Sequence, residues 1–168
     1  MITSNISLGK DVYVEKDASI NNVTIGDETK IAGSTKIFGS KEHILEIGKG
    51  CYVGLNCIIE GFNAKVTIGN YVSFAQNVNL MSGSGSNASV VFQKIFPIIK
   101  GEVYIGEHTW IGASAIIMPN VTLGKFCIVA ANSFVNSSFP NYSIVGGSPA
   151  KLIRSLTQAE IDKIEEND

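Results

Sequence analysis

Residues 105–135 read IGEHTW IGASAI IMPNVT LGKFCI VAANSF V, with an aliphatic residue at the head of every hexapeptide. A period of six fits neither an amphipathic helix, whose period is 3.6, nor a plainly alternating strand. It is typical of a solenoid of very short strands, in which each hexapeptide forms one side of a coil. This stretch therefore predicts an all-β chain wound as a parallel β-helix.

The same spacing continues towards the N-terminus, so the pattern predicts about six three-sided coils. Irregular steps occur only after the third side of a coil, which puts every insertion at one corner of the prism. The insertions cover residues 38–46, 60–67 and 81–104. The additional aliphatic triplets are Leu8, Val14, Ile20; Ile25, Ile31, Ile37; Ile47, Val53, Ile59; and Ile68, Phe74, Leu80.

Composition indicates a single domain with one continuous core and excludes several kinds of partner. The chain has 168 residues, 45% of them hydrophobic and 17% charged, which is enough apolar material for one continuous core. A formal net charge of -2 makes nucleic acid an unsuitable partner. We also expect no membrane span, because no apolar run is long enough, and a cytoplasmic location, because the N-terminus lacks the features of a signal peptide.

Three cysteines occur at the same place in their hexapeptides, four residues after an aliphatic one. Cys51, Cys57 and Cys127 have no metal-ligand spacing, and we expect buried, unpaired thiols.

The organisation predicted is a β-helix domain over residues 1–145, with a protruding loop at 81–104, and a C-terminal tail and helix over 146–168. Thr157 with Glu160 three residues later forms a capping-box motif at the start of that helix. We expect the helix to cover the open end of the solenoid or to pack on a neighbouring copy.

The outward positions on one side of the prism are apolar from the third coil onwards, where Tyr52, Tyr71, Trp110 and Phe126 occur. Such a flank is too apolar to face solvent over its whole length. It suggests burial against copies of the same chain, for which a cyclic homotrimer is the natural closed arrangement.

Four segments together resemble the left-handed β-helix hexapeptide-repeat acyltransferases, in particular the sugar acetyltransferases. They are VYIGEHTWIGA (103–113), VTLG (121–124), AANS (130–133) and VGGSPAKLIR (145–154). The resemblance implies a homotrimer that uses acetyl-CoA as co-substrate and needs no metal. It also implies that the thioester lies between neighbouring solenoids and that loop 81–104 reaches the next subunit.

The resemblance assigns a cofactor-binding set in two groups. Small residues that let the pantetheine arm approach the backbone would be Gly112, Ala113, Ala130 and Ala131. Residues at the nucleotide end of the coenzyme would be Ser148, Pro149, Lys151 and Arg154, two of which are cations suited to phosphates.

The sequence departs from the family pattern in the long loop, where family members usually carry a catalytic histidine. Ser84 and Ser86 stand at the positions of the family's Asp and His, and we assign them with Trp110 to acceptor binding. His108, which follows the loop, is the candidate general base. The other histidine, His43, is expected on a surface loop. A third possibility is that an amine acceptor needs no side-chain base.

These features predict an acetyltransferase that acts on a hydroxyl or amine of a sugar or nucleotide-linked sugar. The alternative is a hexapeptide-repeat trimer that binds CoA or a partner without turnover, because the usual loop histidine is missing. A metal-dependent hydratase on this fold would need three histidine ligands, and the chain has two histidines.

Overall fold

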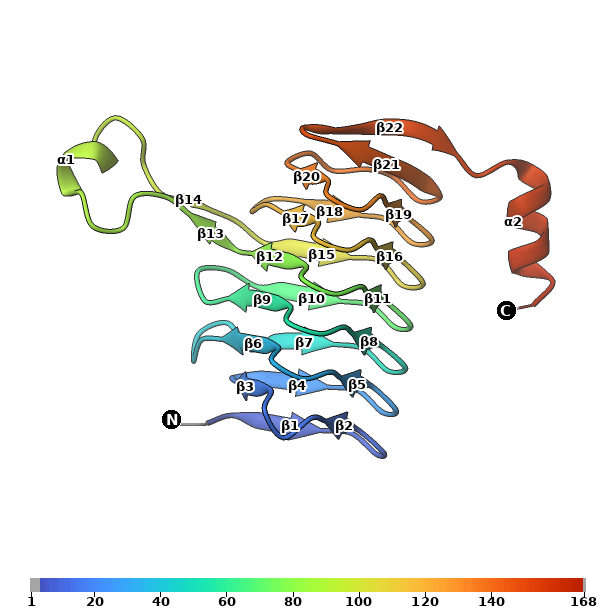
Figure 1. Ribbon diagram of the computed structural model, residues 1–168, viewed down its shortest axis with the longest axis horizontal. Coiled ribbons are helices and arrows are strands. Elements are labelled where there is room, and N and C mark those ends of the chain that lie inside the picture. Colours follow the sequence, from blue (N-terminus) through green and yellow to red (C-terminus); the bar gives the residue numbers. More distant parts are fainter. Residues whose placement is uncertain (1–3, 168) are drawn as a thin grey trace.

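The computed structural model describes residues 4–167 as a three-sided parallel β-solenoid of six coils (Figure 1). Each coil adds one short strand to each of three sheets, which we name A, B and C in the order in which the chain visits them. This is the predicted left-handed β-helix fold.

The strands stack in chain order within every sheet. Sheet A contains β1 (Ile6–Leu8), β4 (Val23–Ile25), β7 (Leu45–Ile47), β10 (Val66–Ile68), β15 (Val103–Ile105) and β18 (Thr122–Leu123). Sheet B contains β2 (Tyr13–Val14), β5 (Lys30–Ile31), β8 (Tyr52–Val53), β11 (Ser73–Phe74), β16 (Trp110–Ile111) and β19 (Ile128–Val129). Sheet C contains β3 (Ser19–Asn21), β6 (Lys36–Gly39), β9 (Ile58–Gly61), β12 (Asn79–Met81), β17 (Ile116–Ile117) and β20 (Phe134–Val135).

The residues that head the hexapeptides form the core. Ile105 pairs with Leu123, Ile111 with Val129, and each is at most 1% exposed. Leu8 in the first coil is 48% exposed because, within residues 4–167, no coil stacks beneath it. The period of six therefore predicted both the inward residues and their register.

The corners between sheets are made by residues in the left-handed region of backbone space. The fourth residue of the hexapeptide has a positive φ at the corners from A to B and, from the second coil onwards, at the corners from B to C. The B–C corner carries Ser34, Asn56, Asn77, Ser114 and Asn132, and of these residue types asparagine adopts the conformation at low cost. The A–B corner carries Asp11, Glu28, Gly50, Tyr71, His108, Phe126 and Tyr142.

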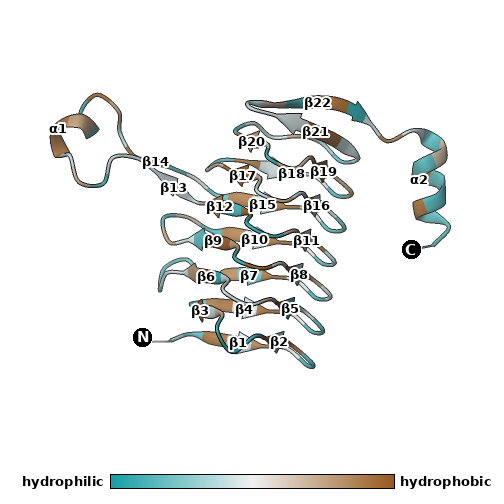
Figure 2. Cartoon of the chain, viewed as in Figure 1, coloured by the Kyte–Doolittle hydropathy of each residue, from teal (hydrophilic) through white to brown (hydrophobic). Residues whose placement is uncertain are grey.

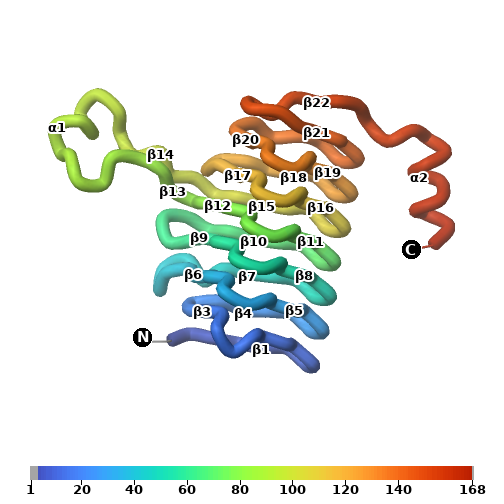
Figure 3. Tube along the Cα trace, in the orientation of Figure 1, coloured from blue at the N-terminus to red at the C-terminus, as the bar shows by residue number. Residues whose placement is uncertain are grey.

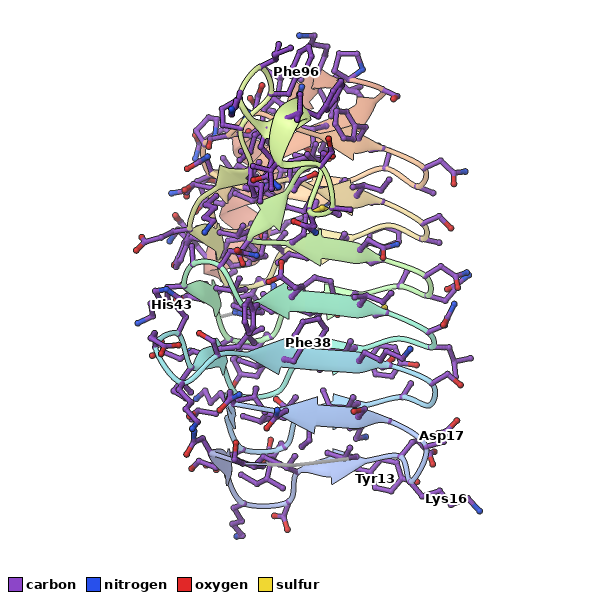
Figure 4. The ribbon with its side chains drawn as sticks, turned by 90° about the vertical axis from the view of Figure 1, so that its left-hand side faces the viewer. Tyr13, Lys16, Asp17, Phe38, His43 and Phe96 are labelled. Carbon is purple, nitrogen blue, oxygen red and sulfur yellow. The ribbon has the colours of Figure 1, made fainter. Side chains whose placement is uncertain are left out.

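All three insertions leave the solenoid at the corner from sheet C to sheet A, as predicted (Figure 3). Figure 4 shows His43 at that end of the sheet C strands and Asp17 at the opposite corner, with Phe38 between them.

The third insertion is an arm that projects from the solenoid, and we use that name for residues 82–101. Its stem is an antiparallel pair, β13 (Gly83–Ser84) and β14 (Ile99–Lys100), and its tip carries the short helix α1 (Val90–Gln93). The tip is apolar (Figure 2), with Val91 73% and Phe96 59% exposed.

The C-terminal segment extends sheet B. Strand β21 (Ser143–Gly147) runs parallel to β19 and antiparallel to β22 (Ala150–Ser155). The helix α2 (Gln158–Glu165) has the predicted Thr157 cap and capping box. It lies beside the solenoid without a buried residue among those described (Figure 1), so the hairpin, and not the helix, covers the last coil in sheet B.

Buried hydroxyl and thiol groups join the coils from inside. Thr109 Oγ1 donates to the Gly124 carbonyl at 3.0 Å and accepts from the Cys127 amide at 3.2 Å. The Cys127 thiol donates to the Pro140 carbonyl at 3.2 Å. Cys51 and Cys57 repeat this arrangement, and all three thiols are free and buried, as predicted.

These thiols make a testable contribution to pH dependence. Burial raises the pKa of all three cysteines above the ordinary thiol value. The folded state therefore keeps protons that the unfolded chain loses, so stability is full below the unfolded thiol pKa and falls as pH rises above it. We expect a loss of up to about 1.4 kcal/mol per thiol for each pH unit until the folded thiol ionises.

The measurement is the urea midpoint between pH 8 and 10. A variant with all three cysteines replaced by serine, which can make the same donor contact without ionising, should show a flatter decline. Equal slopes for the two proteins would contradict this account.

Candidate functional site

Trp110 lies on the outer face of sheet B, in a column that runs the full length of the prism. Its neighbours in register are Ser73 below and Ile128 above. The indole is 53% exposed. A half-exposed indole on a flat sheet can stack on a sugar ring or wall a pocket.

Small residues lie next to the indole on the same face. A Cβ atom built on Gly112 would lie 2.6 Å from the amide nitrogen of Ala131, and one on Gly146 would lie 2.9 Å from the Cβ of Ala130. Gly112, Ala130 and Gly146 thus form a stripe of small residues across three rungs of sheet B, in which Gly112 is buried under the next coil and Ala130 and Gly146 are half-buried. Ala113 and Ala131 flank the stripe, half-buried and exposed respectively.

The C-terminal hairpin brings the second predicted group to this stripe. Lys151 lies opposite Gly146 in the β21–β22 register, and its side chain is exposed. Ser148 and Pro149 form the turn of the hairpin and are exposed. Ser133 was not among the residues predicted from sequence, but it links the hairpin to the solenoid. Its hydroxyl donates to the Ala130 carbonyl at 2.6 Å and accepts from the Gly147 amide at 3.3 Å.

Arg154 is already paired. Its guanidinium makes a bidentate contact with Glu160 at 2.8 and 3.0 Å. That contact lowers the pKa of the Glu160 carboxyl to about 2, and the hydrogen bond from the Thr157 amide adds to it. A phosphate at Arg154 would have to compete with this carboxylate.

His108 lies at the A–B corner, within a column of stacked rings. Its ring centroid is 4.9 Å from that of Tyr71 and 4.7 Å from that of Phe126, and Phe126 stacks in turn on Tyr142 at 5.7 Å. Lys125 Nζ lies over the rings of Phe126 and Tyr142 at 5.9 Å. Both faces of the imidazole are covered, so only its edge can reach a substrate.

The arm places Ser84 and Ser86 at a different corner. Ser84 is half-buried in the stem opposite Ile99, and the Ser86 carbonyl accepts from Gln93 Nε2 at 2.6 Å. Because the arm leaves from the C–A corner, another face of the prism separates these serines from Trp110 within one chain.

A partly buried hydrogen-bond network fixes the root of the arm. The Ser82 hydroxyl donates to Glu60 at 3.2 Å and accepts from the amides of Asn63 and Ala64 at 3.0 and 3.2 Å. The Ser82 amide donates to the Glu60 carboxylate at 3.0 Å, and Ser82 is fully buried. This pair was not predicted from sequence, because Glu60 and Ser82 belong to separate insertions with no common motif.

Two further observations bear on the chemistry. Within residues 4–167, no group of three or more His, Cys, Asp and Glu side chains is placed to hold a metal ion. None of the helices in that range is long and apolar enough to cross a bilayer.

Comparison with protein families adds an independent finding. Residues 102–137 match the family model described as bacterial transferase hexapeptide (six repeats). The chain is 28% identical over 123 residues to galactoside O-acetyltransferase of Lactococcus lactis, a match that covers 73% of this chain and 58% of the relative. Across three curated acetyltransferases that it matches, the chain spans 50–59% of their length.

Two other relatives are covered more fully. The chain is 29% identical over 169 residues to dTDP-4-amino-4,6-dideoxy-D-glucose acyltransferase of Escherichia coli, with 94% of this chain and 87% of the relative covered. Its fold superimposes with a TM-score of 0.80 on AntD, an N-acyltransferase of Bacillus cereus solved with dTDP and 3-hydroxybutyryl-CoA. That match has 24% identity and covers 95% of this chain and 88% of AntD.

Proposed function

Because this chain belongs to the hexapeptide-repeat acyltransferase family, we propose that it transfers an acyl group, acetyl in the simplest case, from acyl-CoA to a sugar. The acceptor atom is a hydroxyl or amine of a free or nucleotide-linked sugar. Relatives of both kinds are known: the Lactococcus lactis protein is a galactoside O-acetyltransferase, and the Escherichia coli protein acts on a dTDP-linked amino sugar.

One observation carries the proposal, namely the stripe of Gly112, Ala130 and Gly146 beside Trp110. A pantetheine arm has amides that pair with backbone groups, and the small, half-buried Ala130 and Gly146 would let it approach them. The stripe leads from the indole to Lys151, so the thioester would lie near Trp110 and the nucleotide near the C-terminal hairpin. Ala113, Ala131, Ser148 and Pro149 flank this path, and Arg154 would reach it after leaving Glu160.

The arm favours a homotrimer as the working unit. Its apolar tip is exposed in one chain, which soluble proteins avoid over such an extent. A neighbouring copy would cover the tip and receive Ser84 and Ser86 near its Trp110, where the hydroxyls would bind the acceptor. The site would then be built from two chains.

The reaction is a thioester aminolysis or alcoholysis. The acceptor nitrogen or oxygen bonds to the thioester carbonyl carbon, the carbon–sulfur bond breaks, and the sulfur leaves as the thiol of CoA. We assign His108 to accept the proton that the nucleophile loses. Positioning of the two substrates supplies much of the rate, as expected for bound reactants.

The test is CoA thiol release from acetyl-CoA across a panel of sugars, amino sugars and dTDP-linked amino sugars. Acceptor-dependent release, weakened at least tenfold by Trp110→Ala, supports the proposal. CoA binding without release on any acceptor supports the alternative of a non-catalytic trimer, which the absence of a histidine in the arm favours. Failure to bind CoA at all would overturn both.

A further inference from the structure

Beneath Trp110, the outer face of sheet B carries a regular row of alternating aromatic and polar side chains. The register runs from Trp110 through Ser73, Tyr52 and Lys30 to Tyr13. The three aromatic residues are about equally exposed, at 53%, 47% and 54%. Adjacent strands are about 4.8 Å apart, so the aromatic side chains repeat at about 10 Å.

The face is hollowed on both sides of this row. A groove of about 600 Å³ lies towards the A–B corner, with Glu28, Gly50 and Tyr71 in its wall. Gly50 contributes to the hollow because it is the one corner residue of that column without a side chain. A smaller groove of about 160 Å³ lies on the other side, beside Tyr13 and Glu15. Lys30 and Tyr52 line both grooves.

The charges around the row do not favour a phosphate-bearing ligand. Asp11 and Glu28 line the larger groove and Glu15 the smaller, against Lys30 as the shared cation. Lys10 lies 3.9 Å from Asp11 and Lys49 lies over the ring of Tyr71, so cations and carboxylates around the grooves balance and leave no net positive field to attract a diphosphate. Carboxylates are, however, strong acceptors for hydroxyl donors, and aromatic faces suit the apolar face of a sugar ring.

We propose that this row binds the non-reacting sugar units of an uncharged oligosaccharide acceptor, with Tyr52 and Tyr13 as stacking platforms. The repeat of the aromatic side chains is close to the length of a disaccharide unit in an extended glycan, so alternate sugars meet an aromatic ring. Lys30 and Ser73 lie between the rings, where they bond hydroxyls. The inference rests on the proposed function, because it places the reacting sugar at Trp110.

Tyr104 supplies a matched control. It is an outward tyrosine on sheet A, 45% exposed, and lies in register with Thr67 and Thr122 and not with another aromatic residue. Removing its ring changes the exposed aromatic area of the protein without touching the row.

The experiment measures binding of neutral glycans to the full chain by calorimetry, with CoA present. The probes are cellobiose and cellotetraose, with the chitin and maltose series of the same lengths, and dTDP. In at least one series the tetrasaccharide should bind roughly tenfold more tightly than the disaccharide. Tyr52→Ala should abolish that gain, as loss of one aromatic contact predicts, and Tyr104→Ala should preserve it.

Equal affinity for the two lengths in every series would overturn the proposal, and so would an equal effect of Tyr52→Ala and Tyr104→Ala. Binding of dTDP that is weakened by Tyr13→Ala or Lys30→Ala would assign the row to a nucleotide instead. Length-dependent binding in a protein that releases no CoA thiol would support glycan binding by the row and contradict the proposed acyltransferase activity. Thiol release without any dependence of binding on glycan length would support the acyltransferase activity and contradict glycan binding by the row.

Discussion

Replacing His108 with phenylalanine should lower kcat for acyl transfer to a sugar hydroxyl by about 10²- to 10⁴-fold, the usual contribution of a positioned general base. The structure indicates that this substitution removes the imidazole without disturbing the backbone or the stacked rings. Phe126 occupies the equivalent corner of the next coil with a φ of 55°, against 58° for His108, so the backbone accepts phenylalanine there. The new ring can stack between Tyr71 and Phe126 as the imidazole does.

Alanine at the same position separates the two roles of the histidine. His108→Ala removes both the base and the stacked ring, so it should lower the melting temperature as well as kcat, whereas His108→Phe should leave the melting temperature close to that of the parent. If His108→Phe retains full activity, the residue serves only the stack. With an amine acceptor the loss should be smaller above pH 8, where the free amine is more abundant.

The repeat was predictable because one physical rule acts at every rung. A buried aliphatic residue at each sixth position determines the inward face, and the insertion corner follows from where the spacing fails. The spacing of six did not predict the C-terminal hairpin. Val145 pairs with Val129 and follows it by 16 residues, whereas 18 residues separate the paired Ile111 and Val129 of two regular coils. Because the last coil is two residues shorter, a search with a fixed period of six does not find β21.

The corners were harder to predict for a different reason. Strands of two residues leave the fourth hexapeptide position in the turn, in a left-handed conformation, and not in an alternating strand. The asparagines of the B–C corner carry that signal, since Asn tolerates positive φ. At the A–B corner only Asp11 and Gly50 give such a signal, whereas Tyr71, His108 and Phe126 accept the conformational cost and recover part of it by stacking.

The candidate site could be only partly assembled from sequence. The small residues, Trp110 and Lys151 were predicted from a resemblance, and the structure brings them to one stripe of sheet B. The pairing of Arg154 with Glu160 and of Ser82 with Glu60 depends on side-chain positions between separate segments, which no local pattern encodes.

Gly112→Ala should destabilise the protein by about 3–5 kcal/mol and lower its melting temperature by roughly 10 °C. The added methyl would lie 2.6 Å from both the amide nitrogen of Ala131 and the carbonyl oxygen of Val129. These are backbone atoms of the next coil, so relief requires the coils to separate where the Gly112 amide donates to the Val129 carbonyl at 2.8 Å. The glycine is thus needed by the fold as well as by any ligand.

Thermal melting with and without CoA shows whether Gly112 is required for stacking of the coils or for binding of the ligand. Ala131→Val is the matched control, because it enlarges an exposed residue beside the same stripe and should leave the melting temperature of the free protein unchanged. If Gly112→Ala melts like the parent and loses only the stabilisation by CoA, the glycine makes room for the ligand alone. Loss of stability in the free protein identifies close stacking of the coils as the reason why glycine occupies this position.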